Sequence, residues 1–286
     1  MNWYEWPDGR AIKGGGSQLE RFNSALEERK KKYPDYKPTK EALNIASVLE
    51  KKGYYHIEKC LDIDQIDRLK EAFDRILLYK QHDNYPYKLK GGGSQDIDTR
   101  VDQKTITIKE VLPFLTNDLI IDIAGAYLGC YPAFCALGLR KEFLDREEGG
   151  TQHFHVDPNS PKFIKFFIYL TDTVDNTHSY VEGSHRRKFE DFESPYRQPT
   201  KRIKELYGED KIKYFTTKKG DLLMSDTNGF HRGTPPIESG KQILTIQYEC
   251  HPDYFNPNNL SMMQQSLFEK IDSKYNNIFD YIEVIK

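Results

Sequence analysis

The sequence lacks the features that would direct it to a membrane or to nucleic acid. Its 286 residues contain no apolar run of about eighteen, the length that spans a bilayer. Residues 1–8 have neither the basic start nor the apolar core of a secretory signal. Lys and Arg number 42 against 44 Asp and Glu, so the chain has no excess positive charge to attract phosphate backbones. We therefore expect a cytoplasmic protein without a nucleic-acid or membrane partner.

Cysteine is scarce as well. The four cysteines, Cys60, Cys130, Cys135 and Cys250, are scattered among apolar neighbours and form no C-x-x-C pair. This pattern disfavours a disulfide framework or a thiolate metal site, and it is typical of free thiols in a core. We expect all four to be unpaired.

The length fits one large β-domain with helical additions. Residues 1–45 form an N-terminal extension and linker, because Pro34 and Pro38 interrupt any helix that contains the charge run at 26–32. Residues 46–286 form the single domain. The sequence Lys-Gly-Gly-Gly-Ser-Gln occurs at 13–18 and again at 90–95, and neither copy has the full spacing of a phosphate-binding loop. We interpret both as flexible surface loops.

The hydrophobic pattern changes along the chain. Helical spacing follows Asp62, covers 108–128 and returns after Pro257. Between these segments lie short runs that are rich in β-branched and aromatic residues, at 133–143, 162–171, 213–217, 221–225 and 242–250, and residues 53–57 form another. Helices, then many strands, then helices predict a β-core flanked by α-segments.

Two histidines and one aspartate stand out within the β-region. His155 and Asp157 are separated by one residue, so in an extended strand their side chains point the same way and can hold one ion. His231 lies far along the chain, in the segment Gly-Phe-His-Arg-Gly-Thr-Pro-Pro. Two imidazoles and a carboxylate are the set that binds ferrous iron on one face and leaves three adjacent positions open.

The order of several segments resembles the phytanoyl-CoA dioxygenase family of iron(II)- and 2-oxoglutarate-dependent oxygenases. They are Gln-His-Phe-His-Val-Asp at 152–157, Phe-Phe-Ile-Tyr-Leu-Thr-Asp at 166–172, Gly-Ser-His-Arg at 183–186, Gly-Asp-Leu-Leu at 220–223 and the His231 segment. The resemblance covers about residues 50–255. It implies a mainly β fold, a double-stranded β-helix or cupin-like jelly roll, supported by N- and C-terminal helices.

The resemblance also implies the chemistry. His155, Asp157 and His231 would bind Fe(II), and 2-oxoglutarate and O2 would be consumed while a C–H bond of a small-molecule metabolite is hydroxylated, with release of succinate and CO2. Asp157 is retained, so no ligand position is vacant for chloride, which favours hydroxylation over halogenation. The resemblance assigns no metal to His185 in the Gly-Ser-His turn. His153 is a candidate neighbour of the site, and His178 falls in a polar loop and receives no role.

One position departs from the family pattern. The family usually has an arginine eleven residues after the second histidine, which binds the far carboxylate of 2-oxoglutarate; here that residue is Gln242. Strand alternation places Gln242 with the more apolar set, facing the core, and makes the adjacent Lys241 a poor substitute. Arg140, Lys141 and Lys165 are the candidate cations, and we favour Arg140. The remaining candidate contacts to 2-oxoglutarate are Gln152 and Thr234.

Two other functions stay open. One, suggested by the uncharged Gln242, is a cupin-like metalloenzyme that does not use 2-oxoglutarate. The other is a barrel that binds a metal or ligand without turnover, although the intact ligand set argues against it. Aromatic residues at 154, 166, 167 and 169 line either the pocket or the core. They do not identify the substrate.

Overall fold

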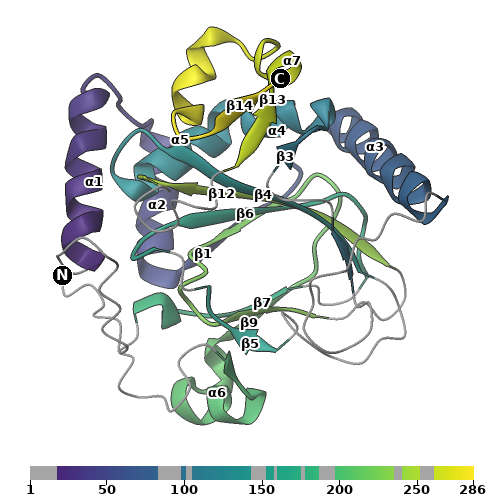
Figure 1. The fold of residues 1–286 in the computed structure, drawn as a ribbon. Coiled ribbons are helices and arrows are strands. Elements are labelled where there is room, and N and C mark those ends of the chain that lie inside the picture. Colours follow the sequence, from purple (N-terminus) through teal and green to yellow (C-terminus); the bar gives the residue numbers. More distant parts are fainter. Residues whose placement is uncertain are drawn as a thin grey trace.

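The computed structural model describes residues 18–82, 98–100, 105–142, 153–157, 160–174, 178–186, 197–234, 240–251 and 261–286. Two β-sheets face each other and form the centre of the molecule (Figure 1). The larger sheet has the order β1 (Tyr54–Ile57), β10 (Leu222–Ser225), β6 (Ile164–Tyr169), β12 (Lys241–Glu249), β4 (Ala133–Glu142) and β2 (Asp98–Arg100). The smaller has the order β8 (Arg197–Gln198), β5 (Phe154–His155), β11 (His231–Gly233), β7 (His178–Val181) and β9 (Ile212–Phe215).

Neighbouring strands within both sheets run antiparallel. Strands that are distant in sequence therefore lie side by side, as in β10 between β1 and β6. This is the double-stranded β-helix expected from the sequence, with helices around it.

The two faces of the larger sheet are packed differently. On β6, Phe166 and Ile168 join the main apolar core with the helices, while Phe167 and Tyr169 face the smaller sheet. We call the space between the two sheets the lumen. Because side chains alternate along a strand, each residue of β12 belongs either to the helix face or to the lumenal face. Ile243 is lumenal, with Phe167 and Tyr169, and Leu244 and Ile246 pack toward the helices.

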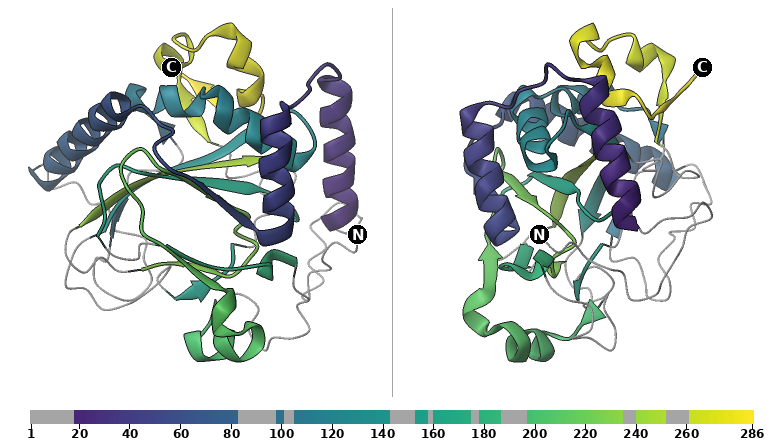
Figure 2. Two further views of the ribbon diagram at one scale, coloured as in Figure 1. Left: turned by 180° about the vertical axis from the view of Figure 1, so that it is seen from behind. Right: turned by 90° about the vertical axis from the view of Figure 1, so that its left-hand side faces the viewer.

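Helices pack around the larger sheet. Its outer face is covered by α3 (Ile63–His82), α4 (Leu112–Leu115) and α5 (Asp118–Leu128), and α1 (Gln18–Lys32) and α2 (Lys40–Lys52) stand at its side. Helix α6 (Thr200–Tyr207) lies beyond the smaller sheet (Figure 2). The boundaries of α2 follow from its capping residues. Thr39 accepts a hydrogen bond from the Ala42 amide at the start, and Gly53 ends the helix with a φ of 87°.

Two helical expectations hold only in part. The segment 108–128 is not continuous: a 3₁₀ turn at Lys109–Val111 leads into α4, and Asn117 then starts α5 by accepting a hydrogen bond from the Ile120 amide. After residue 260 the chain forms β13 (Met262–Gln264), α7 (Gln265–Phe268), a 3₁₀ segment at Ser273–Phe279 and β14 (Glu283–Ile285). Strand β13 pairs with β14 and with β3 (Thr105–Ile106), so long-range pairing outweighs the local helical spacing.

Within the described residues, no single helix is long and apolar enough to cross a membrane. The residues 109–115 and 118–128 meet that criterion by length and composition only when joined, and the two parts are bent by 51°. Most of the α5 side chains among them are buried in this fold.

All four cysteines are free, as the sequence predicts. Cys130 and Cys250 are buried, and Cys60 and Cys135 are partly buried. Burial raises the pKa of the Cys60 thiol to about 11, which keeps it protonated at neutral pH.

A buried arginine joins α1 to the C-terminal segment. Arg29 is 1% exposed, and its guanidinium donates to the carbonyl oxygens of Tyr131 (2.9 Å), Pro132 (2.9 Å) and Asn277 (2.8 Å). It also forms an ion pair with Asp280. A charge removed from water in this way is stable only while its partners remain in place.

We expect Arg29→Ala to lower the free energy of unfolding by about 3–5 kcal/mol, because it removes the donor to three carbonyls and the buried partner of Asp280, which retains its contacts with Lys32 and Tyr33. Urea denaturation followed by circular dichroism measures the change. The control is Arg202→Ala, which removes an exposed arginine paired with Glu205 and should change stability by less than about 0.5 kcal/mol. Equal losses in the two variants would contradict this role of Arg29.

Candidate metal centre

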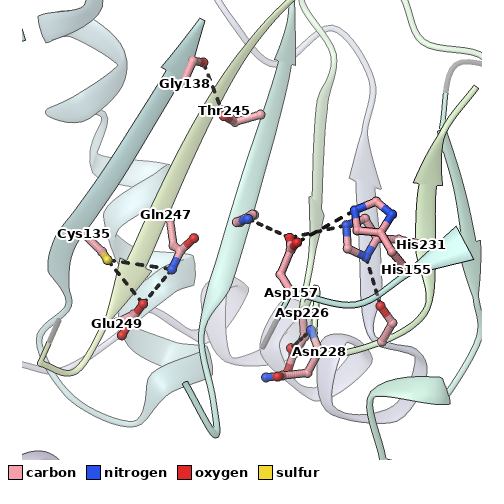
Figure 3. A network of polar contacts seen from close by, with 12 residues as sticks. Cys135, Gly138, His155, Asp157, Asp226, Asn228, His231, Thr245, Gln247 and Glu249 are labelled. Carbon is pink, nitrogen blue, oxygen red and sulfur yellow. Dashed lines mark hydrogen bonds and ion pairs between the residues drawn. The ribbon is translucent and has the colours of Figure 1, made fainter. Parts of the chain in front are cut away.

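Two neighbouring strands bring the candidate metal ligands together. In the smaller sheet β5 pairs with β11, and His155 lies directly opposite His231. Asp157 follows β5, and its amide donates to the carbonyl of Thr227 at 2.9 Å. One side-chain ligand atom from each of the three residues lies within 4.8 Å of the other two, so the group can hold one ion (Figure 3).

The orientation of both imidazoles is fixed by backbone carbonyls. His155 Nδ1 donates to the His153 carbonyl at 2.8 Å, and His231 Nδ1 donates to the Gly229 carbonyl at 3.0 Å. Each ring therefore presents an unprotonated Nε2 to Asp157, at 3.8 Å from Oδ1 for His155 and 3.4 Å from Oδ2 for His231. Metal-binding histidines usually donate their other ring nitrogen in this way.

The electrostatics keep His155 and Asp157 in the forms that bind a metal. Burial, together with the nearby His231, lowers the pKa of His155 to about 3. Burial alone would raise the pKa of Asp157, but Lys165 and the two imidazoles hold it well below its ordinary value. Neutral imidazoles and an ionised carboxylate are the species that coordinate a divalent cation, and the N₂O set with open positions suits non-haem iron(II).

The turn before β11 connects both ligand segments. Asp226 accepts hydrogen bonds from the Tyr127 hydroxyl at 2.6 Å and from the Asn228 amide at 2.9 Å. Its own carbonyl accepts from the Tyr180 hydroxyl at 2.8 Å. The next residue, Thr227, holds the Asp157 amide. One buried turn therefore sets the position of Asp157 and of the strand that carries the second histidine.

Gly229 is required in this turn for steric reasons. A Cβ at Gly229 would overlap the Tyr180 hydroxyl and would approach Ser184 Oγ to 3.0 Å. Ser184 Oγ accepts the amide of Phe230 at 2.8 Å, so the chain between the turn and β11 is held on both sides. The Gly-Phe-His sequence thus reflects close packing as well as a metal ligand.

A second group of charged side chains lies on the lumenal face close to His231. Glu142 is 1% exposed and forms ion pairs with Arg140 Nη2 at 2.8 Å and with Lys241 Nζ at 3.0 Å. Lys241 also donates to the carbonyl of Thr234. A Cβ built on Gly233, two residues beyond His231, would meet Arg140 at 3.5 Å, Glu142 at 3.7 Å and Lys241 at 3.8 Å. Two cations and one carboxylate therefore converge beside the candidate metal ligands.

Relative to the lumen, Lys241 and Gln242 lie opposite to what strand alternation suggested. Gln242 faces the core beneath the helices, where its Nε2 donates to Asp74 Oδ1 of α3 at 2.7 Å. Lys141, the residue opposite Gln242, also contacts Asp74, at 3.2 Å. Lys241 is fully buried on the lumenal side. Sequence alternation failed here because both faces of β12 are buried, so hydrophobicity does not tell the lumenal face from the helix face.

The other sequence candidates are placed as follows. Arg140 is lumenal, whereas Lys165 donates to Asp157 Oδ2 at 2.7 Å and so contacts a candidate metal ligand. His153 is exposed and contributes only its carbonyl to the site. His185 is directed away, toward the Glu50 carbonyl at 3.1 Å. Gln152 lies outside the described residues.

Sequence reasoning missed His178, which it placed in a polar loop. His178 begins β7 opposite Gly233, and its ring stacks on that of His231 with centroids 5.9 Å apart and planes at 20°. Burial, with His231 and Lys241 nearby, lowers its pKa well below the ordinary value. His178 is the first residue of the short strand 178–181, and recognising that strand in the sequence would have identified it. The polar residues just before His178 made the segment resemble a loop.

Comparison with known proteins agrees with this geometry. Residues 49–240 match the family described as phytanoyl-CoA dioxygenase (PhyH). No curated protein matches the sequence.

Several solved structures share the fold. The epimerase SnoN in complex with Fe3+, alpha ketoglutarate and nogalamycin RO has a TM-score of 0.56 and 15% identity, covering 73% of this chain and 83% of SnoN. AviO1 from Streptomyces viridochromogenes Tue57 has a TM-score of 0.55 and 16% identity, covering 74% of this chain and 96% of AviO1. EctD from S. alaskensis with bound Fe has a TM-score of 0.52 and 15% identity, covering 75% of this chain and 80% of EctD. At these identities the similarity establishes the double-stranded β-helix fold and nothing finer.

The buried histidines predict a stability that falls with acidification in the metal-free protein. The folded-state pKa is lowered to about 3 for His155 and about 4 for His185, and well below the ordinary 6.5 for His178. The unfolded chain therefore takes up protons first as the pH falls below about 6.5. The contribution of these rings to the free energy of unfolding is fully present above that pH. Below it, the free energy of unfolding should decrease by about 1.4 kcal/mol per pH unit for each histidine.

Urea unfolding of chelator-treated protein between pH 7.5 and pH 5 measures this slope. His185→Gln, which lies away from the candidate ligands, should reduce the slope by the contribution of one histidine. A stability that is constant over this range would show that the rings have the same pKa in the folded and the unfolded chain, which would contradict the lowered values.

Proposed function

Because the chain belongs to the phytanoyl-CoA dioxygenase family, we propose that it is an iron(II)- and 2-oxoglutarate-dependent oxygenase that hydroxylates a C–H bond of a small molecule. Succinate and CO2 are the co-products. The observation that carries the proposal is the convergence of two imidazole nitrogens and one carboxylate on a single point within the barrel.

In this proposal His155, Asp157 and His231 hold the iron. When bound, iron with 2-oxoglutarate and O2 supplies the oxidant that removes hydrogen from the substrate. The residues around it have separate tasks. Lys165 binds the Oδ2 oxygen of Asp157, and this fixes the carboxylate in place. The carbonyls of His153 and Gly229 hold the rings. The preserved carboxylate supports hydroxylation, since no ligand position is freed for a halide.

We further propose that Lys241 and Arg140 bind the far carboxylate of 2-oxoglutarate. With Glu142 they carry a net charge of +1, and one additional carboxylate would balance it. Thr234 Oγ1, buried and without a hydrogen-bond partner among the described residues, is a further donor near the same place. Lys241 would then do the work that the family assigns to an arginine, from the neighbouring position on the strand.

Apolar side chains complete the lumen. Phe167, Tyr169 and Ile243 from the larger sheet pack with Tyr180 and Phe215 from the smaller one. They exclude water, which strengthens the ionic contacts of a bound co-substrate. Hydroxylation is the outcome we favour; SnoN, with the same fold, is named an epimerase, so the fold alone does not decide the reaction.

Asp157→Ala should abolish iron-dependent formation of succinate from 2-oxoglutarate, because it removes the only carboxylate among the three candidate ligands. The loss should exceed about a hundredfold, as for removal of a group that catalysis requires. Asp210→Ala, which changes an exposed aspartate, is the matched control and should retain full activity. Wild-type rates in Asp157→Ala would refute the proposed iron site.

Lys241→Met and Gln242→Met separate the two faces of β12. Loss of the lumenal cation should raise the Kd of 2-oxoglutarate by about thirtyfold or more, the effect of removing one partner from a buried charge pair. Gln242→Met, on the helix face, should change it by less than about threefold, a difference of under 1 kcal/mol. Calorimetric titration of zinc-loaded protein measures both. A larger effect from Gln242 than from Lys241 would return the anchor to the position expected from the family pattern.

A further inference from the structure

A polar cluster on the lumenal face of the larger sheet has no role in the chemistry above. Gln247 and Glu249 of β12 and Cys135 of β4 meet there (Figure 3). Gln247 Nε2 donates to Glu249 Oε1 at 2.6 Å, and Cys135 Sγ donates to the same oxygen at 3.3 Å. Gln247 and Glu249 are 4% and 2% exposed.

The cluster lies next to the candidate iron site. Gln247 pairs across the strands with Lys165 of β6, and Lys165 Nζ contacts Asp157. Opposite residues on neighbouring strands point to the same face with their Cβ atoms about 5 Å apart. Gln247 and Glu249 therefore continue the lumenal surface from the metal ligands, on β12 beyond the apolar Ile243. Lys241, at the start of this strand, lies at the proposed co-substrate end.

The second oxygen of Glu249 is the unusual feature. Both donors within the cluster are directed at Oε1, and Oε2 is buried without a hydrogen-bond partner among the described residues. Burial raises the pKa of this carboxyl, against the opposing effects of Cys135, Gln247 and Lys165. A buried carboxylate oxygen without a donor costs free energy, and few buried polar atoms in folded proteins are left unsatisfied without a specific role.

We propose that Glu249 Oε2 binds an amine or hydroxyl group of the substrate, with Gln247 and Cys135 fixing the carboxylate. The proposal rests on the oxygenase function and defines the substrate class: a polar small molecule that places a hydrogen-bond donor at the end of the lumen opposite the 2-oxoglutarate anchor. An ammonium group would also supply a positive charge to pair with the Glu249 carboxylate. Lys165 is already engaged with Asp157.

The test compares three probes with the same four-carbon chain: n-butylamine, n-butanol and butyrate. Their dissociation constants are measured by NMR titration of the protein loaded with zinc and 2-oxoglutarate, which does not turn over. The wild type should bind butylamine more tightly than butyrate. Glu249→Gln, which keeps the shape and removes the charge, should weaken butylamine at least about tenfold, as expected for loss of a hydrogen bond to a charged group. A parallel loss for butanol assigns the site to hydroxyl as well as amine donors.

Glu205→Gln is the matched control, because it makes the same substitution at an exposed glutamate of α6 that is paired with Arg202; butylamine binding should change by less than about threefold. The Kd of 2-oxoglutarate should be the same in both variants and the wild type. Unchanged butylamine binding in Glu249→Gln, or a preference for butyrate in the wild type, would overturn the proposal. Failure of the wild type to bind 2-oxoglutarate would instead refute the oxygenase function, so the two failures are distinct.

Discussion

The pairing of β5 with β11 is the contact on which the site depends. It places His155 opposite His231, although the two residues are far apart in sequence, and Asp157 joins them because its backbone amide donates a hydrogen bond to the Thr227 carbonyl. Bringing three metal-binding groups into a desolvated barrel is costly without a cation, because their lone pairs point at one another. The surrounding structure maintains the arrangement with two backbone carbonyls, one lysine and a buried turn. The arrangement therefore lowers the stability of the metal-free fold and provides a geometry that a metal can use.

The alternation of side chains along β12 organises the rest of the lumen. Residues from Lys241 to Glu249 alternate between a face packed on helices and a face directed at the smaller sheet. On the lumenal face they run from the cation Lys241, through Ile243 and the polar side chains of Thr245 and Gln247, to the buried carboxylate of Glu249. Under the proposals above, a co-substrate with two carboxylates and a substrate with a hydrogen-bond donor would bind at opposite ends of this series. One strand would thus distinguish the two molecules by charge.

The sequence predicted more of the site's core than of its surroundings. His155 and Asp157 were recognisable because their spacing has a direct meaning in a strand, and His231 because of its place in an ordered set of segments. The cation that we propose as the anchor was not predictable, since both faces of β12 are buried and hydrophobicity does not tell one from the other. His178 and the strand β13 were missed for a related reason. Their conformation depends on pairing with distant strands, which local composition does not record.

The most direct test of the account is an anaerobic titration of the metal-free protein with iron(II) and 2-oxoglutarate, followed by visible absorption. Chelation of the keto acid beside three protein ligands produces a weak charge-transfer band. We expect this band only when both components are present, and we expect it to be absent in His231→Ala. A protein that binds iron but develops no band at saturating 2-oxoglutarate would contradict the central claim that two imidazoles and one carboxylate leave open positions for the co-substrate.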